Sequence, residues 1–177
     1  MDPAPATAQT AGVGHPADLD DDALLAACDV ARTRRSGPGG QHRNKVETAV
    51  VLTHRPTGLT AEAGERRTSA ENRRAAIARL RLRLALEVRT ERTETSPRWA
   101  RRVRAGRLAI NPSHADLPAL LAEALDVMAQ HAWEAPPAAA ALGVSTSQLV
   151  RLLGHEPRAL AQVNARRQAR GRPALRR

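Results

Sequence analysis

The chain has 177 residues, 42% of them hydrophobic, but it contains no Phe or Tyr, and Trp99 and Trp133 are its only aromatic residues. Its core must be built from Ala, Leu, Val and Ile, and stacking of single-stranded bases on aromatic rings is not expected. The net charge of +10 indicates a polyanionic partner. No apolar run approaches the roughly 18 residues of a membrane span, so we expect a cytoplasmic protein with no membrane partner.

The charge is unevenly distributed. Residues 1–30 carry six acidic side chains and no Lys or Arg, whereas residues 31–110 carry 20 basic and seven acidic side chains and residues 111–177 carry eight and five. All bases except Lys45 are Arg, whose planar guanidinium suits phosphate groups. The single Cys28 can form no internal disulfide, and its apolar neighbours favour a packing role in the core.

The N-terminal third predicts a tail, a short helix and three strands. Residues 1–17, rich in Ala, Pro, Thr and Gly, are predicted to be a disordered tail. An Asp cluster followed by Leu and Ala predicts a short helix within 19–28, with a solvated acidic segment as the alternative. Alternating apolar residues and the turn Pro56-Thr57-Gly58 predict strands at 29–35, 46–54 and 59–63.

Residues 66–92 present two periodicities. Arg79 to Leu84 alternate as in a half-buried strand, but the segment has more than twenty residues without Gly or Pro, and Thr68 with Glu71 has the spacing of a capping box. We therefore predict one long helix. Its apolar face is formed by Ile77, Leu80, Leu84 and Val88.

The C-terminal half predicts a basic connector and a helical module. The connector, 95–112, is either an RNA contact or a solvated linker with Trp99 held against a domain. Helices are predicted at 117–130, 138–142 and 145–153, with Trp133 packed between the first two.

The last two of these helices are joined at Gly143-Val144, with Ser145 as N-cap and Gln148 as its capping partner. This pattern of two helices joined by a short turn is typical of a helix-turn-helix motif, although helical hairpins joined at Gly also arise from packing alone. The last arginines are predicted to form a basic tail: Arg166, Arg167, Arg170, Arg172, Arg176 and Arg177.

The segment Ser36-Gly37-Pro38-Gly39-Gly40-Gln41 predicts a tight loop between the first two strands. Glycines permit backbone torsions that other residues avoid and allow close approach to a ligand. No Ser, Cys or Lys stands beside a base in a nucleophilic arrangement. His42 and His54, separated by a predicted strand, are interpreted as RNA contacts or packed residues rather than as a base or metal ligands. No metal or other cofactor is expected, and the loop would act by entering a site that another molecule completes.

The loop and its continuation resemble the catalytic domain of class I peptide chain release factors. The resemblance covers roughly residues 28–88 and includes Gly39-Gly40-Gln41, Asn44 three residues later and the Pro-Thr-Gly turn. It implies hydrolysis of the peptidyl-tRNA ester by water on the ribosome, with the backbone N–H of Gln41 directed at the developing oxyanion.

The resemblance also assigns roles to single residues. Gly39, Gly40 and Gln41 would be catalytic, and Gln41 would also be a methylation site, with a methyltransferase as a further partner. The main partners would be large-subunit ribosomal RNA and peptidyl-tRNA. The expected RNA-binding residues are Arg34, Arg35, His42, Arg43, Asn44, Lys45, Arg73 and Arg74, with Asn44 bracing the loop.

Together these features predict an α+β protein: a small antiparallel sheet with a GGQ hairpin loop packed on a long helix, followed by an all-α C-terminal module with a helix-turn-helix pattern. The expected divisions are a tail (1–17), a catalytic domain (18–94), a basic linker (95–112) and a helical module with a basic tail (113–177).

Only 35 residues precede Ser36, too few for a codon-reading domain, and the chain is more similar to short release factor-like rescue proteins. That resemblance implies codon-independent rescue of stalled ribosomes. The alternatives are a non-catalytic module that binds ribosomal RNA or tRNA, and a helix-turn-helix DNA-binding protein. Against the second, the charge excess lies in 31–110 rather than in 145–153.

Overall fold

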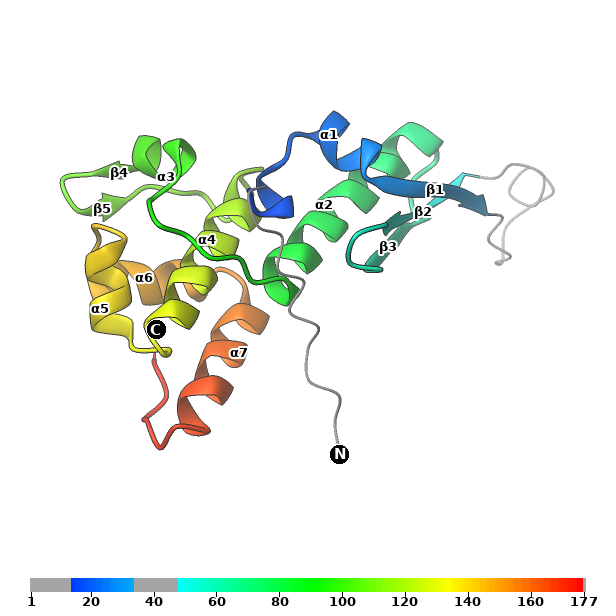
Figure 1. The fold of residues 1–177 in the computed structure, drawn as a ribbon. Coiled ribbons are helices and arrows are strands. Elements are labelled where there is room, and N and C mark those ends of the chain that lie inside the picture. The colour runs from blue at the N-terminus through cyan, green and yellow to red at the C-terminus, as the bar shows by residue number, and fades with distance from the viewer. Residues whose placement is uncertain (1–13, 34–47, 177) are drawn as a thin grey trace. The chain divides into compact units, whose positions relative to one another are not determined.

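A computed structural model describes residues 14–33 and 48–176 (Figure 1). The described residues divide into two compact units, 16–84 and 85–176, the second of which also includes residues 14 and 15. We call them the sheet unit and the helical unit. The fold is α+β, as predicted, with a small antiparallel sheet in the first unit and mainly helices in the second. No helix in the described part of the chain is long and apolar enough to cross a membrane.

The sheet consists of β1 (Cys28–Thr33), β2 (Ala49–His54) and β3 (Thr60–Ala63), in the order β1-β2-β3. All neighbours are antiparallel, and the three predicted strands are confirmed. The turn at Pro56-Thr57-Gly58 is also confirmed, with Gly58 at a φ of 69°. In β2 the alternate residues Val50, Leu52 and His54 are buried.

The long predicted helix is α2 (Ser69–Glu87), which lies along the sheet (Figure 1). Its capping box is formed: the Glu71 carboxylate accepts from Thr68 N at 3.3 Å, and Thr68 Oγ1 accepts from Glu71 N at 3.2 Å. Ile77, Leu80 and Leu84 are buried on one face, as predicted. Helical spacing therefore overrides the alternation of Arg and Leu in this segment.

Ahead of the sheet lie a 3₁₀ turn, η1 (Pro16–Asp18), and the helix α1 (Asp21–Ala26), which the sequence predicted. Asp20 caps α1 by accepting from Ala23 N at 2.8 Å. The predicted tail is wrong at its C-terminal end, because His15 and Ala17 are both only 1% exposed. A short segment with few apolar groups can still be ordered when a packed body buries those few. Residues 1–13 of that tail lie outside the described residues.

The core of the helical unit is α4 (Leu117–Gln130), whose residues from Ala119 to Met128 are all buried. Around it pack α5 (Ala135–Ala141), α6 (Thr146–Leu153) and α7 (Pro157–Gln168). The prediction of α4 is confirmed. The two consecutive prolines, 136 and 137, begin α5 rather than precede it, since proline suits the first turn of a helix.

The predicted linker 95–112 is largely ordered. It contains α3 (Pro97–Arg102) and a small hairpin of β4 (Val103–Arg104) and β5 (Arg107–Leu108). Trp99 is 1% exposed and its Nε1 donates to the carbonyl of Leu142 at 2.8 Å. The packed tryptophan agrees with the alternative in which Trp99 is held against a domain, but the helix and hairpin show that the rest of the segment is not a solvated linker.

The predicted basic tail is also wrong at its start, because Arg166 and Arg167 belong to α7. Arg167 is 7% exposed and donates to the carbonyls of Trp133 at 2.8 Å and Pro173 at 3.0 Å. Trp133 has a φ of 65° and lies in a turn, so its backbone carbonyl is not hydrogen-bonded within a helix or strand. Net charge in the sequence did not reveal that an arginine could satisfy backbone groups in the interior.

Candidate functional site

The predicted catalytic loop joins the paired ends of β1 and β2. Thr33, the last residue of β1, stands opposite Ala49, the first of β2. Most of the predicted site residues lie outside the described residues, namely Arg34, Arg35, Gly39, Gly40, Gln41, His42, Arg43, Asn44 and Lys45. The strands on both sides of the loop and their register are described, so the base of the candidate site can be analysed.

A buried amide holds the chain where it enters β2. Asn72, in the first turn of α2, is 0% exposed. Its Nδ2 donates to the carbonyl of Thr48 at 2.7 Å and to that of Arg66 at 3.1 Å, and its Oδ1 accepts from Arg66 N at 2.8 Å. One side chain thus ties the residue before β2 to the segment before α2. Such a fully satisfied buried amide fixes both backbones in one geometry.

Sequence reasoning missed Asn72. It lies four residues before Ala76 and eight before Leu80, both 0% exposed, and therefore on the buried stripe of α2. A polar residue on an apolar stripe of a predicted helix was the available signal, since a buried amide needs partners. Asn44, which the resemblance assigned as the brace of the loop, lies outside the described residues.

Arg73 and Arg74, the two predicted RNA-binding residues that are described, are both exposed on α2. They directly follow Asn72, so they lie at the end of α2 that contacts the start of β2. Neither forms a hydrogen bond or ion pair through its side chain with another described residue, and the same holds for Arg67 nearby. By contrast, Arg79 further along α2 is paired with Glu65 at 2.6 Å.

The titratable residues of the sheet do not form a catalytic set. Burial, with the neighbouring charge of Arg55, lowers the pKa of His54, whose Nδ1 lies 2.8 Å from Thr57 Oγ1. His54 is 3% exposed and is thus a packed residue at the end of β2. Burial raises the pKa of the Cys28 thiol, in agreement with the predicted packing role. In the described ranges, no group of three or more His, Cys, Asp or Glu is placed to hold a metal ion.

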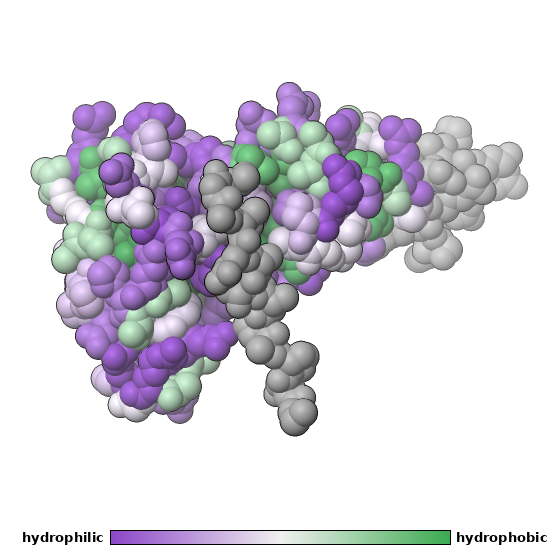
Figure 2. All heavy atoms as spheres, viewed as in Figure 1, coloured by the Kyte–Doolittle hydropathy of each residue, from purple (hydrophilic) through white to green (hydrophobic). Residues whose placement is uncertain are grey.

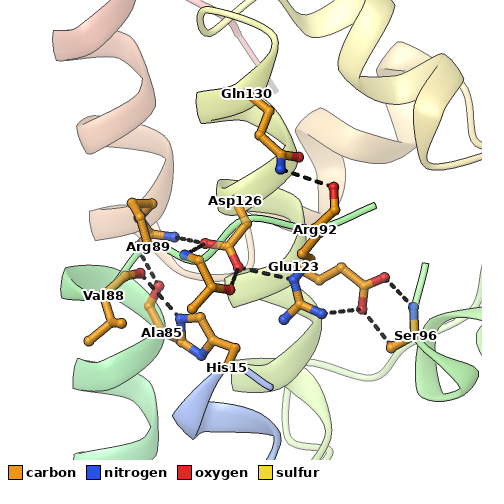
Figure 3. A network of polar contacts seen from close by, with 10 residues as sticks. His15, Ala85, Val88, Arg89, Arg92, Ser96, Glu123, Asp126 and Gln130 are labelled. Atoms are coloured by element: carbon orange, nitrogen blue, oxygen red, sulfur yellow. Dashed lines mark hydrogen bonds and ion pairs between the residues drawn. The ribbon is translucent and has the colours of Figure 1, made fainter. Parts of the chain in front are cut away.

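A second cluster of charged residues lies in the helical unit (Figure 3). At its centre is Asp126 of α4, whose side chain is 0% exposed. Its Oδ1 accepts from Arg89 at 3.3 Å and Thr90 N at 3.1 Å, and its Oδ2 accepts from Thr90 Oγ1 at 2.7 Å and Arg92 Nε at 3.0 Å. Both oxygens are saturated, so this carboxylate fastens residues 89–92 to α4.

Glu123, one turn earlier on α4, extends the cluster. Its oxygens accept from Ser96 N at 2.8 Å and Ser96 Oγ at 2.6 Å (Figure 3). His15 lies in the same region, where its Nε2 is 3.2 Å from the carbonyl of Val88. Every acid in the cluster is buried and hydrogen-bonded, which leaves no carboxylate oriented toward a substrate. The cluster is structural.

Comparison with known families identifies the segment that contains the loop. Residues 25–112 match the model of the RF-1 domain. The chain carries an RF-1 domain. The match includes Gly39, Gly40 and Gln41 and the whole sheet, and it ends beyond the predicted domain limit at 94, after the β4–β5 hairpin.

Several named release factors share this segment. The chloroplastic peptide chain release factor PrfB1 of Arabidopsis thaliana is 42% identical over 64 residues, which are 36% of this chain and 14% of that protein. Peptide chain release factor 1 of Leptothrix cholodnii is 50% identical over 58 residues (33% and 16%). Peptide chain release factor 1 of Xylella fastidiosa is 36% identical over 92 residues (52% and 23%). The chain thus spans less than a quarter of the length of these relatives.

Within the RF-1 domain, the structure brings together one part of the predicted site. Arg73 and Arg74 lie beside Asn72, whose amide contacts Thr48 next to the loop. The RF-1 domain therefore combines a loop between paired strands, a buried amide near the point where that loop ends, and unpaired arginines on the adjacent helix. No described residue of this group is a nucleophile or a general base.

Proposed function

We propose that this protein hydrolyses the ester of peptidyl-tRNA on the ribosome through Gly39-Gly40-Gln41. The observation that carries the proposal is the RF-1 domain match over residues 25–112, which includes this tripeptide between two paired strands. The names of the matched relatives, all peptide chain release factors, support it further. The ribosome is the proposed partner, and a cytoplasmic location stays a prediction from the sequence.

In the proposed reaction, water attacks the ester carbonyl carbon. The bond from that carbon to the ribose oxygen breaks, the peptide leaves with a free carboxyl group, and the ribose oxygen takes a proton. Gly39 and Gly40 let the backbone bend so that the N–H of Gln41 donates to the oxyanion. The Gln41 side chain orients the water, and its amide is the proposed methylation site. Ribosomal RNA completes the site, in keeping with the lack of a catalytic side-chain set among the described residues.

The arginines around the loop have a separate role in the proposal. Arg73 and Arg74 neutralise RNA phosphates together with Arg34, Arg35, Arg43 and Lys45, while His42 and Asn44 contact RNA near the loop. The support for this assignment is that Arg73 and Arg74 are exposed and that neither forms an ion pair in the described part of the chain, although the charge of Arg74 also acts on Glu71. Phosphate contacts of this kind position a protein on RNA.

The test is peptide release from stalled ribosomes that carry labelled peptidyl-tRNA. Gly40→Ala restricts the backbone that presents the Gln41 N–H, and loss of one oxyanion donor typically lowers a rate by about 10²- to 10³-fold. Gln41→Ala is expected to lower release as well. Gln168→Ala, at an exposed position in α7, is the matched control and should release at the wild-type rate. Equal release by all four proteins would overturn the proposal.

Codon independence is tested in the same assay. Release is compared on ribosomes with an empty A site, a sense codon or a stop codon, and on isolated large subunits with peptidyl-tRNA. We expect release without a stop codon. A strict requirement for one would refute codon independence but not hydrolysis. Salt-dependent binding without release on any of these substrates would instead favour a non-catalytic RNA-binding role.

A further inference from the structure

Three arginines on one edge of the helical unit are exposed and unpaired. They are Arg101 at the end of α3, Arg104 in β4 and Arg107 in β5. Among the described residues, none of their side chains forms a hydrogen bond or an ion pair. Arg98 and Arg102 of the same segment instead bind the Asp116 carboxylate, at 3.2 and 2.7 Å. The segment thus contains two kinds of arginine, and Figure 2 shows hydrophilic residues gathered where α3 lies, at the upper left.

The hairpin places two of these arginines directly opposite each other. Arg104 and Arg107 are partners in the β4–β5 register, and like charges at opposed positions destabilise a strand pair. The turn between them, Ala105-Gly106, has φ values of 48° and 71°, which keeps the hairpin tight. A tight hairpin that holds two cations together without a described counter-ion is suited to an anion from another molecule.

The tip of the hairpin lies beside the turn between α5 and α6. A Cβ added to Gly106 would lie 4.0 Å from the carbonyl oxygen of Gly143. α5 and α6 form the predicted helix-turn-helix, with Ser145 capping α6 by accepting from Gln148 N at 3.2 Å. The arginine-bearing hairpin and this pair of helices therefore form one continuous surface.

The outward side of α6 is polar and carries no acid. Leu149, Leu152 and Leu153 are buried, while Arg151 is exposed and Gln148 is half-buried three residues before it. A hollow of about 450 Å³ separates α6 from the segment after β5. Its lining consists of Leu108, Ala109, Ile110, Pro112, Gln148, Arg151, Leu152 and His155. Cations and amide donors without carboxylates make a surface that attracts an anion.

We propose that Arg101, Arg104, Arg107, Gln148 and Arg151, here called the hairpin surface, bind the phosphate backbone of double-helical RNA. Both tryptophans of the protein are buried, so neither indole ring is available to stack on unpaired bases. Backbone recognition of a duplex needs no such ring. The choice of RNA over DNA rests on the proposed ribosomal function. The observation that these arginines are unpaired and lie on one surface does not depend on that function.

The test uses the full-length protein and a 20-base-pair RNA duplex, with a DNA duplex of the same sequence and a single-stranded RNA as comparisons. Binding is measured between about 50 and 200 mM salt. Each lost phosphate contact should reduce the slope of log affinity against log salt by about 0.9 for a duplex. The double variant Arg104→Gln with Arg107→Gln should therefore reduce it by about two, and Arg151→Gln by about one. Arg158→Gln, an exposed arginine of α7 paired with Glu156 at 2.8 Å, should leave it unchanged.

Two further results decide the proposal. Arg104→Lys with Arg107→Lys, which keeps the charges, should retain most of the wild-type slope. If the Gln variants keep the wild-type slope, or Arg158→Gln lowers it equally, the hairpin surface is refuted. Equal or tighter binding to DNA would refute the assignment to RNA. Gln41→Ala should bind the duplex as wild type does, so failure of the release assay and failure of this proposal are separate outcomes.

Discussion

The start of α2 in the sheet unit and the Asp126 cluster in the helical unit use arginine in opposite ways. In the sheet unit, Arg73 and Arg74 are exposed and form no ion pair with another described residue, although the charge of Arg74 helps to lower the pKa of Glu71. In the helical unit, Arg89 and Arg92 lie against the buried Asp126 and are only 20% and 11% exposed. The net charge of a sequence therefore does not locate a nucleic-acid surface. The arginines that fold the protein must first be set aside, and only the remainder is available to a partner.

A second difference concerns the polar group that fastens each unit. Asn72 is neutral and binds three backbone groups, whereas Asp126 is charged and binds two arginines and a threonine. A neutral amide costs little to bury once its bonds are made, but a buried charge depends on its counter-charges. This contrast predicts that damage at Asp126 affects stability, whereas damage at Asn72 also affects the position of the loop.

The largest effect on stability is expected for Asp126→Asn. The amide keeps the shape but removes the charge that Arg89 and Arg92 face, and breaking a buried ion pair in this way typically costs about 3–5 kcal/mol. The free energy of unfolding is measured by urea denaturation. The matched control is Asp116→Asn, whose carboxylate also binds two arginines but is 25% exposed, so the loss should be about 1 kcal/mol or less. Equal losses in the two variants would contradict the distinction between buried and exposed pairs.

The next effect is expected for Asn72→Leu, which leaves the carbonyls of Thr48 and Arg66 and the N–H of Arg66 without their partner. One unsatisfied buried group costs about 1–3 kcal/mol, so the free energy of unfolding should fall by at least that amount. Because Asn72 holds the chain near the loop, the rate of peptide release at saturating ribosomes should also fall, at a temperature where the variant remains folded. Asn72 is thus predicted to be a positioning residue.

The control for this prediction is Asn164→Leu in the helical unit. Asn164 likewise exchanges two hydrogen bonds with the backbone of Leu175, at 3.1 and 2.7 Å. Its loss should lower stability without changing the rate of release. If both variants release at the wild-type rate while folded, Asn72 has a structural role only.

Much of the sheet unit could be predicted because its signals are local. The strands, the Pro56-Thr57-Gly58 turn and the Thr68–Glu71 capping box depend on neighbouring residues, and all of them are confirmed. The loop residues were recognised by their motif. Asn72 was missed because its partners, Thr48 and Arg66, come from two other segments.

The errors in the helical unit have a common cause. The basic-tail prediction assumed that the C-terminal arginines are solvated, but Arg167 donates to the carbonyl of Trp133, 34 residues away in sequence. Trp99 was expected to be held against a domain, but the sequence did not identify its partner, the carbonyl of Leu142, 43 residues away. Such long-range contacts satisfy backbone groups that the sequence alone does not pair. The composition of a segment indicates whether it is soluble, but not which carbonyl elsewhere in the chain needs a hydrogen-bond donor.

The smallest effect is expected from pH, and it comes from His15. Burial lowers the pKa of this imidazole below its ordinary value of 6.5; Asp126 and the bond to Val88 oppose this, and the charges of Arg89 and Arg92 add to it. The unfolded chain therefore binds a proton more readily than the folded one, so stability should fall as pH decreases through about 6.5. One proton changes the free energy of unfolding by at most about 1.4 kcal/mol per pH unit.

In His15→Gln, the decrease in stability between pH 7 and 5 should be smaller than in wild type, as measured by urea denaturation at each pH. The buried His54 contributes the same pH dependence to both proteins, so only the difference between their curves of unfolding free energy against pH reports on His15. Parallel curves would show that protonation of His15 does not affect folding.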